Sequence, residues 1–203
     1  MVKYTLNYFD TAGRAESIRL MFHAAGVEFN DNRISGEEWA KNKTDGKRFP
    51  LHQMPTLEVD DNVICQSSAI ARFVARELGF YGNNSLEQAV IDQVCETFSD
   101  IGAELIKIIF GGNDEEAKKT KLQEFYASDK YKLLMGFISK TLKQHNEGKA
   151  FIAGEKISIA DFVLVGLLCM IELDLKEFPE ISALRERVLS IENIKKYMDT
   201  QKK

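Results

Sequence analysis

The first part of the chain alternates between strand-like and helix-like patterns of hydrophobic residues. From residue 2 to residue 8, apolar and polar side chains alternate one by one, which is typical of a strand with one buried face. Residues 14–26 carry apolar side chains at helical spacing and end at Gly26, a residue type that often follows the last turn of a helix. Residues 29–34 give a second strand-like run. The pattern predicts a strand, a helix and a strand, and the helical crossover makes the two strands parallel.

A hairpin and a second helix are predicted next. Residues 56–59 and 63–65 are short apolar runs, and the polar residues between them favour a tight turn, which predicts an antiparallel pair. A helical pattern begins at Ser67. Unpaired backbone N–H groups and the helix dipole at such a start favour a carboxylate or phosphate. Because Pro55 precedes the hairpin and Ser67 follows it, we expect the two residues to lie close together and outline a pocket for a small anion.

Beyond residue 85 the pattern is helical throughout. Ser85 with Gln88, and Ser158 with Asp161, have the spacing of N-terminal capping boxes. The helix after Ser158 is apolar on nearly all sides, which is typical of a buried helix. We interpret Asp161 as the cap of that helix and not as a catalytic acid. Helical spacing predicts segments at residues 86–110, 115–127, 130–146, 158–175, 180–190 and 193–201.

These elements predict a thioredoxin-like α/β N-terminal domain followed by an all-α helical C-terminal domain. We place the first domain at residues 1–79, a polar linker at 80–85 and the helical domain at 86–203. Residues 35–52 are charged and follow neither period, so we expect an irregular segment there. It holds the only tryptophan, Trp39, which either packs against the domain or covers a ligand.

Composition and charge narrow the possible partners. The formal net charge of the 203 residues is −4 and no block of basic residues stands out, so nucleic acid is not an expected partner. No apolar run approaches the roughly 20 residues that a membrane-spanning helix needs. The N-terminus lacks the basic-then-apolar pattern of a secretion signal. We therefore expect a cytoplasmic protein that does not bind membranes.

The cysteines and histidines do not form the pattern of a metal site or a redox centre. Cys65, Cys95 and Cys169 lie far apart and form no CxxC pair. The histidines have no ligand spacing with one another or with the cysteines. We expect the cysteines to behave as small hydrophobic residues in a reducing compartment, and we expect no metal.

Several motifs occur together in an order that points to one known family. They are YTLNYF at 4–9, GRAE at 13–16, the pair Trp39 and Lys43, QMPTLEVDD at 53–61, QSSAIARFVARELG at 66–79 and KISIADF at 156–162. Over nearly its whole length the chain resembles the sigma-class glutathione transferases, which include haematopoietic prostaglandin D synthase, parasite and insect enzymes and the S-crystallins of cephalopod lenses. The resemblance implies a homodimer that conjugates glutathione to small apolar electrophiles, with no cofactor beyond the co-substrate glutathione.

Tyr8, at the end of the first strand, is the catalytic residue that the resemblance implies. A free thiol has a pKa of about 8.5, yet the thiolate is the nucleophile. A hydroxyl that donates a hydrogen bond to the glutathione sulfur stabilises the anion and lowers that pKa. Arg14 would add a positive field near the same sulfur. From spacing alone, Tyr8 also fits an aromatic residue of the buried strand face, and Arg14 a solvated residue of the first helical turn.

The resemblance also implies the residues that bind glutathione. Met54 would pair its backbone with the cysteinyl part, beside Gln53, and its peptide bond to Pro55 would be cis. Gln66 and Ser67 would hold the γ-glutamyl carboxylate, which agrees with the anion pocket predicted from the helix start.

Two further contacts to glutathione are implied. Trp39 and Lys43 would meet the glycine carboxylate, but the segment after Lys43 is longer than in several relatives, and Lys47 and Arg48 are nearby alternatives. Asp100 would reach the glutathione amino group in the neighbouring subunit.

The second substrate would bind between the two domains. Candidates by position are Phe9, Gly13, Arg14, Glu104, Leu105 and Ile108. Prostaglandin H2 D-isomerase and glutathione peroxidase activities would use the same thiolate, but Lys107 stands where prostaglandin D synthase has a pocket tryptophan, which disfavours the isomerase. A non-catalytic lens crystallin or ligand carrier is the remaining alternative. Crystallins of this family typically carry an insertion in the helical domain, and this sequence shows none, which favours the enzyme.

Overall fold

The structure, a computed structural model, describes residues 2–201. Its four-stranded sheet has the order β2-β1-β3-β4. β1 and β2 are parallel, with Leu6 opposite Asp31, whereas β3 is antiparallel to both β1 and β4. This confirms the predicted crossover and hairpin. The strands are β1 (Tyr4–Phe9), β2 (Asn30–Ile34), β3 (Thr56–Val59) and β4 (Asn62–Cys65).

β1 is buried on both faces, and the prediction of a single buried face was wrong. Leu6 and Asn7 are neighbours that point to opposite faces, and both side chains are fully buried. The Asn7 amide donates to the Glu58 carboxylate at 2.8 Å and its carbonyl accepts from Arg48 at 2.9 Å. A buried amide is stable when its hydrogen bonds are satisfied in this way, so a polar residue in the pattern did not mark an exposed position.

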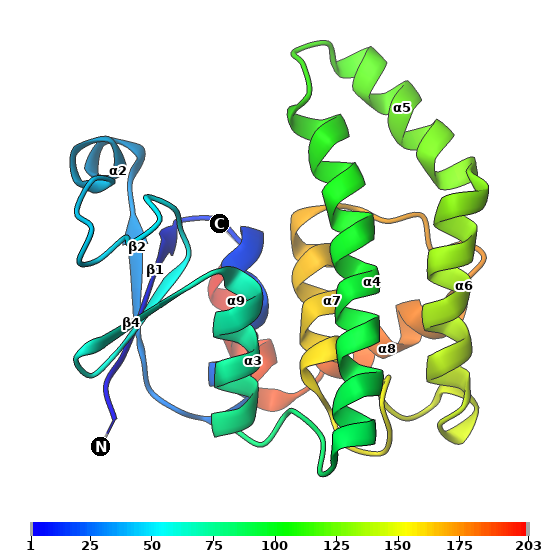
Figure 1. The fold of residues 1–203 in the computed structure, drawn as a ribbon. Coiled ribbons are helices and arrows are strands. Elements are labelled where there is room, and N and C mark those ends of the chain that lie inside the picture. Colours follow the sequence, from blue (N-terminus) through cyan, green and yellow to red (C-terminus); the bar gives the residue numbers. More distant parts are fainter. Residues whose placement is uncertain (1, 202–203) are drawn as a thin grey trace.

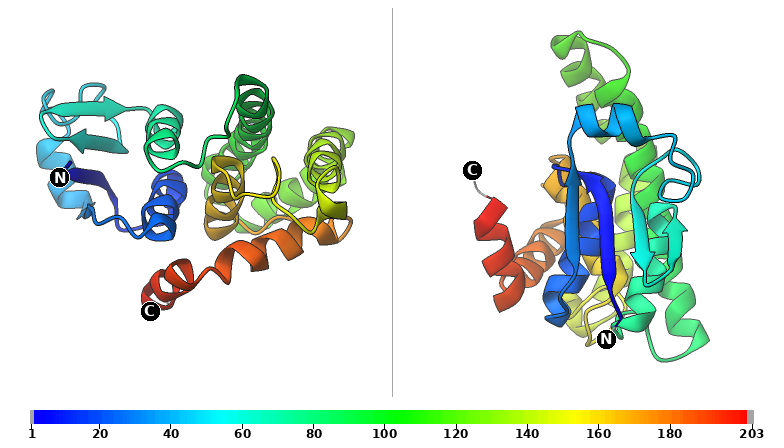
Figure 2. Two further views of the ribbon diagram at one scale, coloured as in Figure 1. Left: turned by 90° about the horizontal axis from the view of Figure 1, so that it is seen from below. Right: turned by 90° about the vertical axis from the view of Figure 1, so that its left-hand side faces the viewer.

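Two helices cover the face of the sheet that bears Leu6 (Figure 1; Figure 2). They are α1 (Glu16–Ala25), which follows a 3-10 turn η1 (Gly13–Ala15), and α3 (Ser67–Glu77). Leu6 and Leu57 from the sheet share one hydrophobic core with Ile18 of α1 and Ile70 of α3. Gly26 ends α1 with a left-handed φ of 65°, as predicted from its place in the pattern.

Residues 36–42 form a further helix, α2 (Gly36–Asn42), which corrects the expectation of an irregular segment. The Ser35 hydroxyl accepts from the Glu38 N–H at 3.2 Å, and the Glu38 carboxylate accepts from the Ser35 N–H at 3.0 Å. α2 buries none of its residues, so hydrophobic periodicity could not reveal it. The S-x-x-E spacing of this capping box was the available signal.

The second half of the chain is all-helical, as predicted. Its helices are α4 (Ser85–Phe110), α5 (Glu115–Ala127), α6 (Asp129–Lys143), α7 (Ile159–Met170), α8 (Pro179–Leu189) and α9 (Glu192–Gln201), with a 3-10 turn η2 (Asn146–Gly148). α7 lies at the centre and packs against α1, α4 and α8 (Figure 1). None of the helices within residues 2–201 is long and apolar enough to span a bilayer.

The two predicted capping boxes have different outcomes. Ser158 and Asp161 form theirs, with Asp161 fully buried at the start of α7. The box at Ser85 is wrong, because Asn84 caps α4 and its side-chain oxygen accepts from two backbone N–H groups at 3.0 Å each. Asn is among the strongest capping residues, and here it lies one position earlier than the predicted serine.

The last helix returns to the first domain. The Tyr197 hydroxyl of α9 donates to the Glu16 carboxylate at 3.0 Å, and its ring stacks on His23 of α1 with centroids 4.1 Å apart. α9 therefore packs on α1, although the two helices belong to different predicted domains. The predicted linker between those domains lies between the end of α3 and the start of α4. The boundaries at residues 79 and 86 stay a prediction.

Candidate functional site

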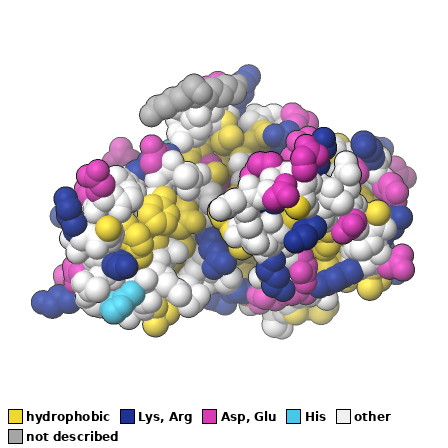
Figure 3. All heavy atoms as spheres, turned by 90° about the horizontal axis from the view of Figure 1, so that it is seen from above, with side chains coloured by type: hydrophobic (Ala, Val, Ile, Leu, Met, Phe, Trp, Pro, Cys, Tyr) yellow, Lys and Arg dark blue, Asp and Glu magenta, His cyan; other side chains and the backbone are white. Residues whose placement is uncertain are grey.

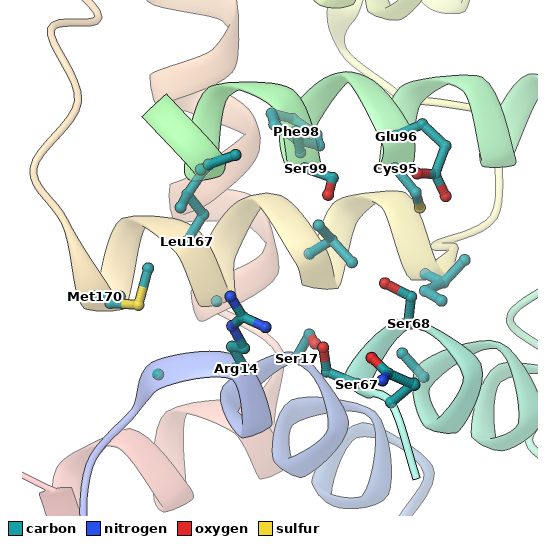
Figure 4. A pocket seen from close by; sticks show the side chains of 18 of the residues that line it. Arg14, Ser17, Ser67, Ser68, Cys95, Glu96, Phe98, Ser99, Leu167 and Met170 are labelled. Atoms are coloured by element: carbon teal, nitrogen blue, oxygen red, sulfur yellow. The ribbon is translucent and has the colours of Figure 1, made fainter. Parts of the chain in front are cut away.

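A cavity of about 360 Å³ lies between α1 and α3 on one side and α4 and α7 on the other (Figure 4). Seen from above, the molecule is hollowed between its two lobes, and Lys or Arg side chains border the hollow (Figure 3). Four residues predicted from the sequence line the cavity: Gly13, Arg14, Gln66 and Ser67. The structure thus brings together the loop after β1 and the start of α3, which lie far apart in the sequence.

The start of α3 has the geometry of an anion site. Gln66 adopts a φ of 72°, a left-handed conformation that non-glycine residues rarely take and that is frequent at functional sites. No side chain caps α3, so the backbone N–H groups of its first turn remain available to a ligand carboxylate. Ser67 and Ser68 direct their side chains toward the cavity (Figure 4). This arrangement is consistent with the predicted contacts of Gln66 and Ser67.

Tyr8, half-buried near the end of β1, does not itself line this cavity but is hydrogen-bonded to Arg14, which does. Its hydroxyl oxygen accepts a hydrogen bond of 3.1 Å from the backbone N–H of Arg14. Within residues 2–201 no acceptor is found for the hydrogen of the same hydroxyl. The Arg19 guanidinium lies 5.9 Å from the centre of the Tyr8 ring and is fully buried, with ion pairs to Glu16 and Asp31. The tyrosine therefore has a fixed position and a hydroxyl that can donate.

Gly13 determines how closely the loop approaches Tyr8. A Cβ atom built on Gly13 would lie 2.5 Å from the Tyr8 hydroxyl oxygen, and the φ of Gly13 is 45°. Both features require glycine. The next residue, Arg14, is exposed and projects its side chain into the cavity toward α7 (Figure 4).

The predicted cis peptide bond between Met54 and Pro55 is confirmed. Met54 lies just before β3, is half-buried, and makes no backbone hydrogen bond within residues 2–201. Its N–H and C=O are therefore free to pair with an extended peptide. Gln53 beside it is exposed.

The predicted site for the glycine carboxylate is less defined. The Trp39 ring packs edge-on against Phe49 and Phe9, with centroids 5.0 and 6.1 Å away, which supports the packing interpretation. Lys43 is exposed and makes no ion pair within the described residues. Arg48 is engaged by Glu58 at 3.2 Å and by Asn7, so it is not free for a ligand.

The α4 face of the cavity differs from the predicted one. Leu105 is fully buried in the core, and neither Glu104 nor Ile108 lines the cavity. Glu104 instead pairs with Lys130 at 2.7 Å. Phe9 also lies outside the lining, so Gly13 and Arg14 are the predicted second-substrate residues that this cavity contains. The α4 and α7 residues that do line it include Ser99, Gly102, Ala103, Ile106, Leu167 and Met170.

Polar residues of α4 border the α3 end of the cavity. Arg72 of α3 pairs with Asp92 at 2.7 Å and with Glu96, and the Tyr81 hydroxyl donates to Asp92 at 2.5 Å. Asp100 is exposed on α4 and does not line the cavity of this single chain. The predicted contact of Asp100 with a neighbouring subunit stays a prediction.

The thiols of Cys95 and Cys169 are poor nucleophiles in this structure. Burial raises the pKa of the Cys95 thiol, which borders the cavity, to about 12, and burial raises that of Cys169 to about 11. Cys65 is half-buried, and all three thiols are free. Within residues 2–201, no three His, Cys, Asp or Glu side chains cluster as metal ligands would. The polar side chains that line the cavity include those of Arg14, Ser67 and Glu96.

Comparison with known proteins identifies the family of the chain. Residues 4–76 match the glutathione S-transferase N-terminal domain, and residues 99–201 match the glutathione S-transferase C-terminal domain. The chain belongs to the glutathione S-transferase family. Its similarity to other glutathione S-transferases extends over nearly the whole chain and supports an enzyme of this kind.

The relatives of this transferase include glutathione S-transferases and S-crystallins. The chain is 35% identical to glutathione S-transferase 1 of Ascaris suum and 32% identical to S-crystallin 4 of Enteroctopus dofleini, covering 98% of this chain and 96% of the relative in both cases. The solved structure of a Pi-class glutathione S-transferase from Onchocerca volvulus superposes with a TM-score of 0.86 at 30% identity, covering 98% of this chain and 93% of that one. The family is therefore established, and the sigma class stays a prediction.

Proposed function

We propose that this protein is a sigma-class glutathione transferase that activates glutathione through Tyr8. The observation that carries the proposal is the state of the Tyr8 hydroxyl. Its oxygen accepts from the Arg14 N–H, and its hydrogen has no acceptor within residues 2–201. A hydroxyl held in this way can donate to a sulfur placed in the cavity, and a bond of that kind is stronger to the thiolate than to the thiol.

Glutathione would bind across the N-terminal part of the cavity. Its γ-glutamyl carboxylate would meet the first turn of α3 at Gln66 and Ser67. Its cysteinyl backbone would pair with the free backbone groups of Met54, beside Gln53. Trp39 and Lys43 would face its glycine carboxylate, since Arg48 is already engaged by Glu58. No further cofactor is needed.

The reaction would proceed in two simple steps. The thiol of bound glutathione loses its proton to solvent, and the Tyr8 hydroxyl stabilises the thiolate that remains. The thiolate then attacks an electrophilic carbon of a small apolar substrate held against α4 and α7. Arg14 projects into the same space (Figure 4) and would favour negative charge that develops there.

We further propose a cytoplasmic homodimer. In that assembly Asp100, exposed on α4, would contact the amino group of glutathione bound to the other subunit. Sedimentation of the purified protein tests the dimer: a monomer at working concentration contradicts it.

Turnover of a chloronitrobenzene with glutathione tests the transferase activity. We expect conjugation at a rate well above the uncatalysed reaction, with chloride as the leaving group. Absence of turnover with this and other electrophiles would contradict the proposal. Glutathione binding without turnover would instead support a non-catalytic role, an alternative motivated by the similarity to an octopus S-crystallin. Prostaglandin H2 isomerisation and peroxide reduction would need the same thiolate, so assays with those substrates separate the remaining alternatives.

A further inference from the structure

The hydroxyl of Ser17, on α1, is buried without a hydrogen-bond partner. The structure describes nine buried polar or charged residues within residues 2–201. Eight of the nine make side-chain hydrogen bonds within that range, and Ser17 makes none although only 9% of its surface is exposed. Because buried polar groups are normally hydrogen-bonded, this hydroxyl is available to a ligand.

Ser17 faces the cavity between the two lobes. It belongs to the lining of that cavity, and Figure 4 shows its side chain between those of Arg14 and Ser67. Arg14 precedes Ser17 by three residues, so the two lie on the same face of the helical segment that η1 and α1 form. The unpaired hydroxyl and the guanidinium therefore face the same space.

Ser17 lies where α1 and α7 approach each other closely. A Cβ atom built on Gly166 of α7 would lie 3.0 Å from the backbone nitrogen of Ser17 and 3.4 Å from its Cβ. The expected contacts of glutathione at Met54 and Gln66 come instead from the loop before β3 and from the start of α3. Since the proposed function places the electrophile against α4 and α7, Ser17 is positioned to contact that substrate.

The start of α1 favours negative charge at this position. Within residues 2–201 no side chain caps η1 or α1, and the positive end of a helix dipole stabilises anions. Glu16, in the first turn, does not oppose this, because it is buried in contacts with Arg19 at 3.2 Å and with the Tyr197 hydroxyl at 3.0 Å. Glu96, which also lines the cavity, is paired with Arg72. A hydroxyl in this position is therefore suited to donate to an oxygen that becomes negative.

We propose that Ser17 is a further catalytic residue, whose hydroxyl donates a hydrogen bond to an oxygen of the electrophile as that oxygen gains negative charge. The inference rests on the proposed transferase function and adds a residue to it. With chlorodinitrobenzene, the thiolate sulfur forms a bond to the ring carbon that carries chlorine, and an electron pair of the ring moves onto a nitro group. The pair returns to the ring as the carbon–chlorine bond breaks and chloride leaves. Ser17 stabilises the charge on the nitro oxygen and keeps its own proton.

Two electrophiles that differ in where charge develops test the inference in the full-length protein. Chlorodinitrobenzene places charge on a nitro oxygen, whereas benzyl chloride has no oxygen and passes the charge directly to the departing chloride. Ser17→Ala should reduce kcat/KM for chlorodinitrobenzene about tenfold and leave kcat/KM for benzyl chloride and KM for glutathione unchanged. Ser139→Ala is the matched control, because Ser139 is a buried helical serine outside the cavity whose hydroxyl donates to Glu180; it should keep the native ratio of the two kcat/KM values.

A second measurement does not depend on turnover. Trinitrobenzene has no leaving group, so its adduct with the glutathione thiolate stays as a coloured anion, and its formation on the protein can be titrated by visible absorbance. We expect the formation constant on Ser17→Ala to be about tenfold lower than on the native protein.

Three results would overturn the role of Ser17 while leaving the transferase function intact. They are native kcat/KM for chlorodinitrobenzene in Ser17→Ala, equal losses with both chlorides, and an unchanged formation constant with trinitrobenzene. A raised KM for glutathione with native use of both electrophiles would also overturn it, because the hydroxyl would then bind glutathione. Absence of conjugation by the native protein with either chloride would instead overturn the proposed function on which the inference rests.

Discussion

The backbone N–H of Arg14 donates a hydrogen bond of 3.1 Å to the hydroxyl oxygen of Tyr8. This bond joins the end of β1 to the loop that leads into α1. In this bond the hydroxyl oxygen is the acceptor, so the bond holds the hydroxyl in place. The hydroxyl hydrogen stays available to donate to a ligand. The proposed activation of glutathione depends on that arrangement, and the predictions below test its parts.

Gly13→Ala should displace the Tyr8 hydroxyl. The new Cβ would lie 2.5 Å from the hydroxyl oxygen, and φ at this position is 45°. We expect turnover to fall about ten- to a hundredfold, equivalent to the loss of one hydrogen bond to a charged group. Steady-state conjugation measures it. Gly46→Ala is the control, because its Cβ would contact nothing within 4 Å. Native turnover in Gly13→Ala would show that the Tyr8 position is unimportant.

Ser67→Ala should weaken glutathione binding more than it slows the chemical step. Ser67 opens α3 and lines the cavity, where a carboxylate would accept hydrogen bonds from its hydroxyl and backbone. We expect KM for glutathione to rise about tenfold and kcat to change little. Ser68→Ala, one residue along the same helix, should have a smaller effect. Equal effects of the two substitutions on KM would argue against a specific contact at Ser67.

Asp161 should make stability depend on pH. Burial raises the pKa of this carboxyl to about 6, against hydrogen bonds that it accepts from Ile152 and Ser158. Because the folded state binds the proton more tightly than the unfolded state, its contribution is present below the ordinary pKa of about 4 and is lost as the pH rises through about 6. The loss amounts to at most about 3 kcal/mol.

Urea unfolding of Asp161→Asn measures that contribution. The amide cannot accept all of the hydrogen bonds that the carboxylate receives, so we expect the variant to be less stable by about 2–4 kcal/mol. Its unfolding free energy should also lack the decline between pH 4 and pH 6 that the native protein shows. An identical pH profile in both proteins would show that another group titrates.

Tyr197→Phe should loosen the contact between α9 and α1. The substitution keeps the ring that stacks on His23 but removes the hydroxyl that donates to Glu16 at 3.0 Å. Glu16 would keep its ion pair with Arg19 and lose one donor. We expect the unfolding free energy to fall by about 1–2 kcal/mol, measured by urea unfolding. An unchanged unfolding free energy would mean that the hydrogen bond between Tyr197 and Glu16 contributes nothing to stability.

Much of the fold could be predicted because its elements bury one clear face. Periodicity located β1, α1, the hairpin and most helices, and Gly26 marked the end of α1. α2 was missed because it buries nothing. The return of α9 to α1 was missed because a contact such as that between Tyr197 and Glu16 joins positions that no local pattern relates.

The position of the expected site residues in the fold could be anticipated for one side of the cavity only. Ser67 lies at the start of α3 and lines the cavity, as expected from the local signature of a helix start. The α4 residues expected in the second-substrate pocket do not line this cavity, because α4 packs on helices from two directions and has more than one apolar face. Leu105 points into the core, whereas Gly102 and Ala103 face the cavity. Hydrophobicity does not distinguish a core face from a substrate face.

The pKa of the glutathione thiol in the complex tests the central role of Tyr8 most directly. Thiolate formation can be followed by ultraviolet absorbance across a pH titration of the native protein and of Tyr8→Phe, each saturated with glutathione. We expect the native complex to titrate well below the free thiol value of about 8.5, and Tyr8→Phe to titrate about one to two units higher than the native complex. Equal thiol pKa values in the two complexes would contradict activation by Tyr8.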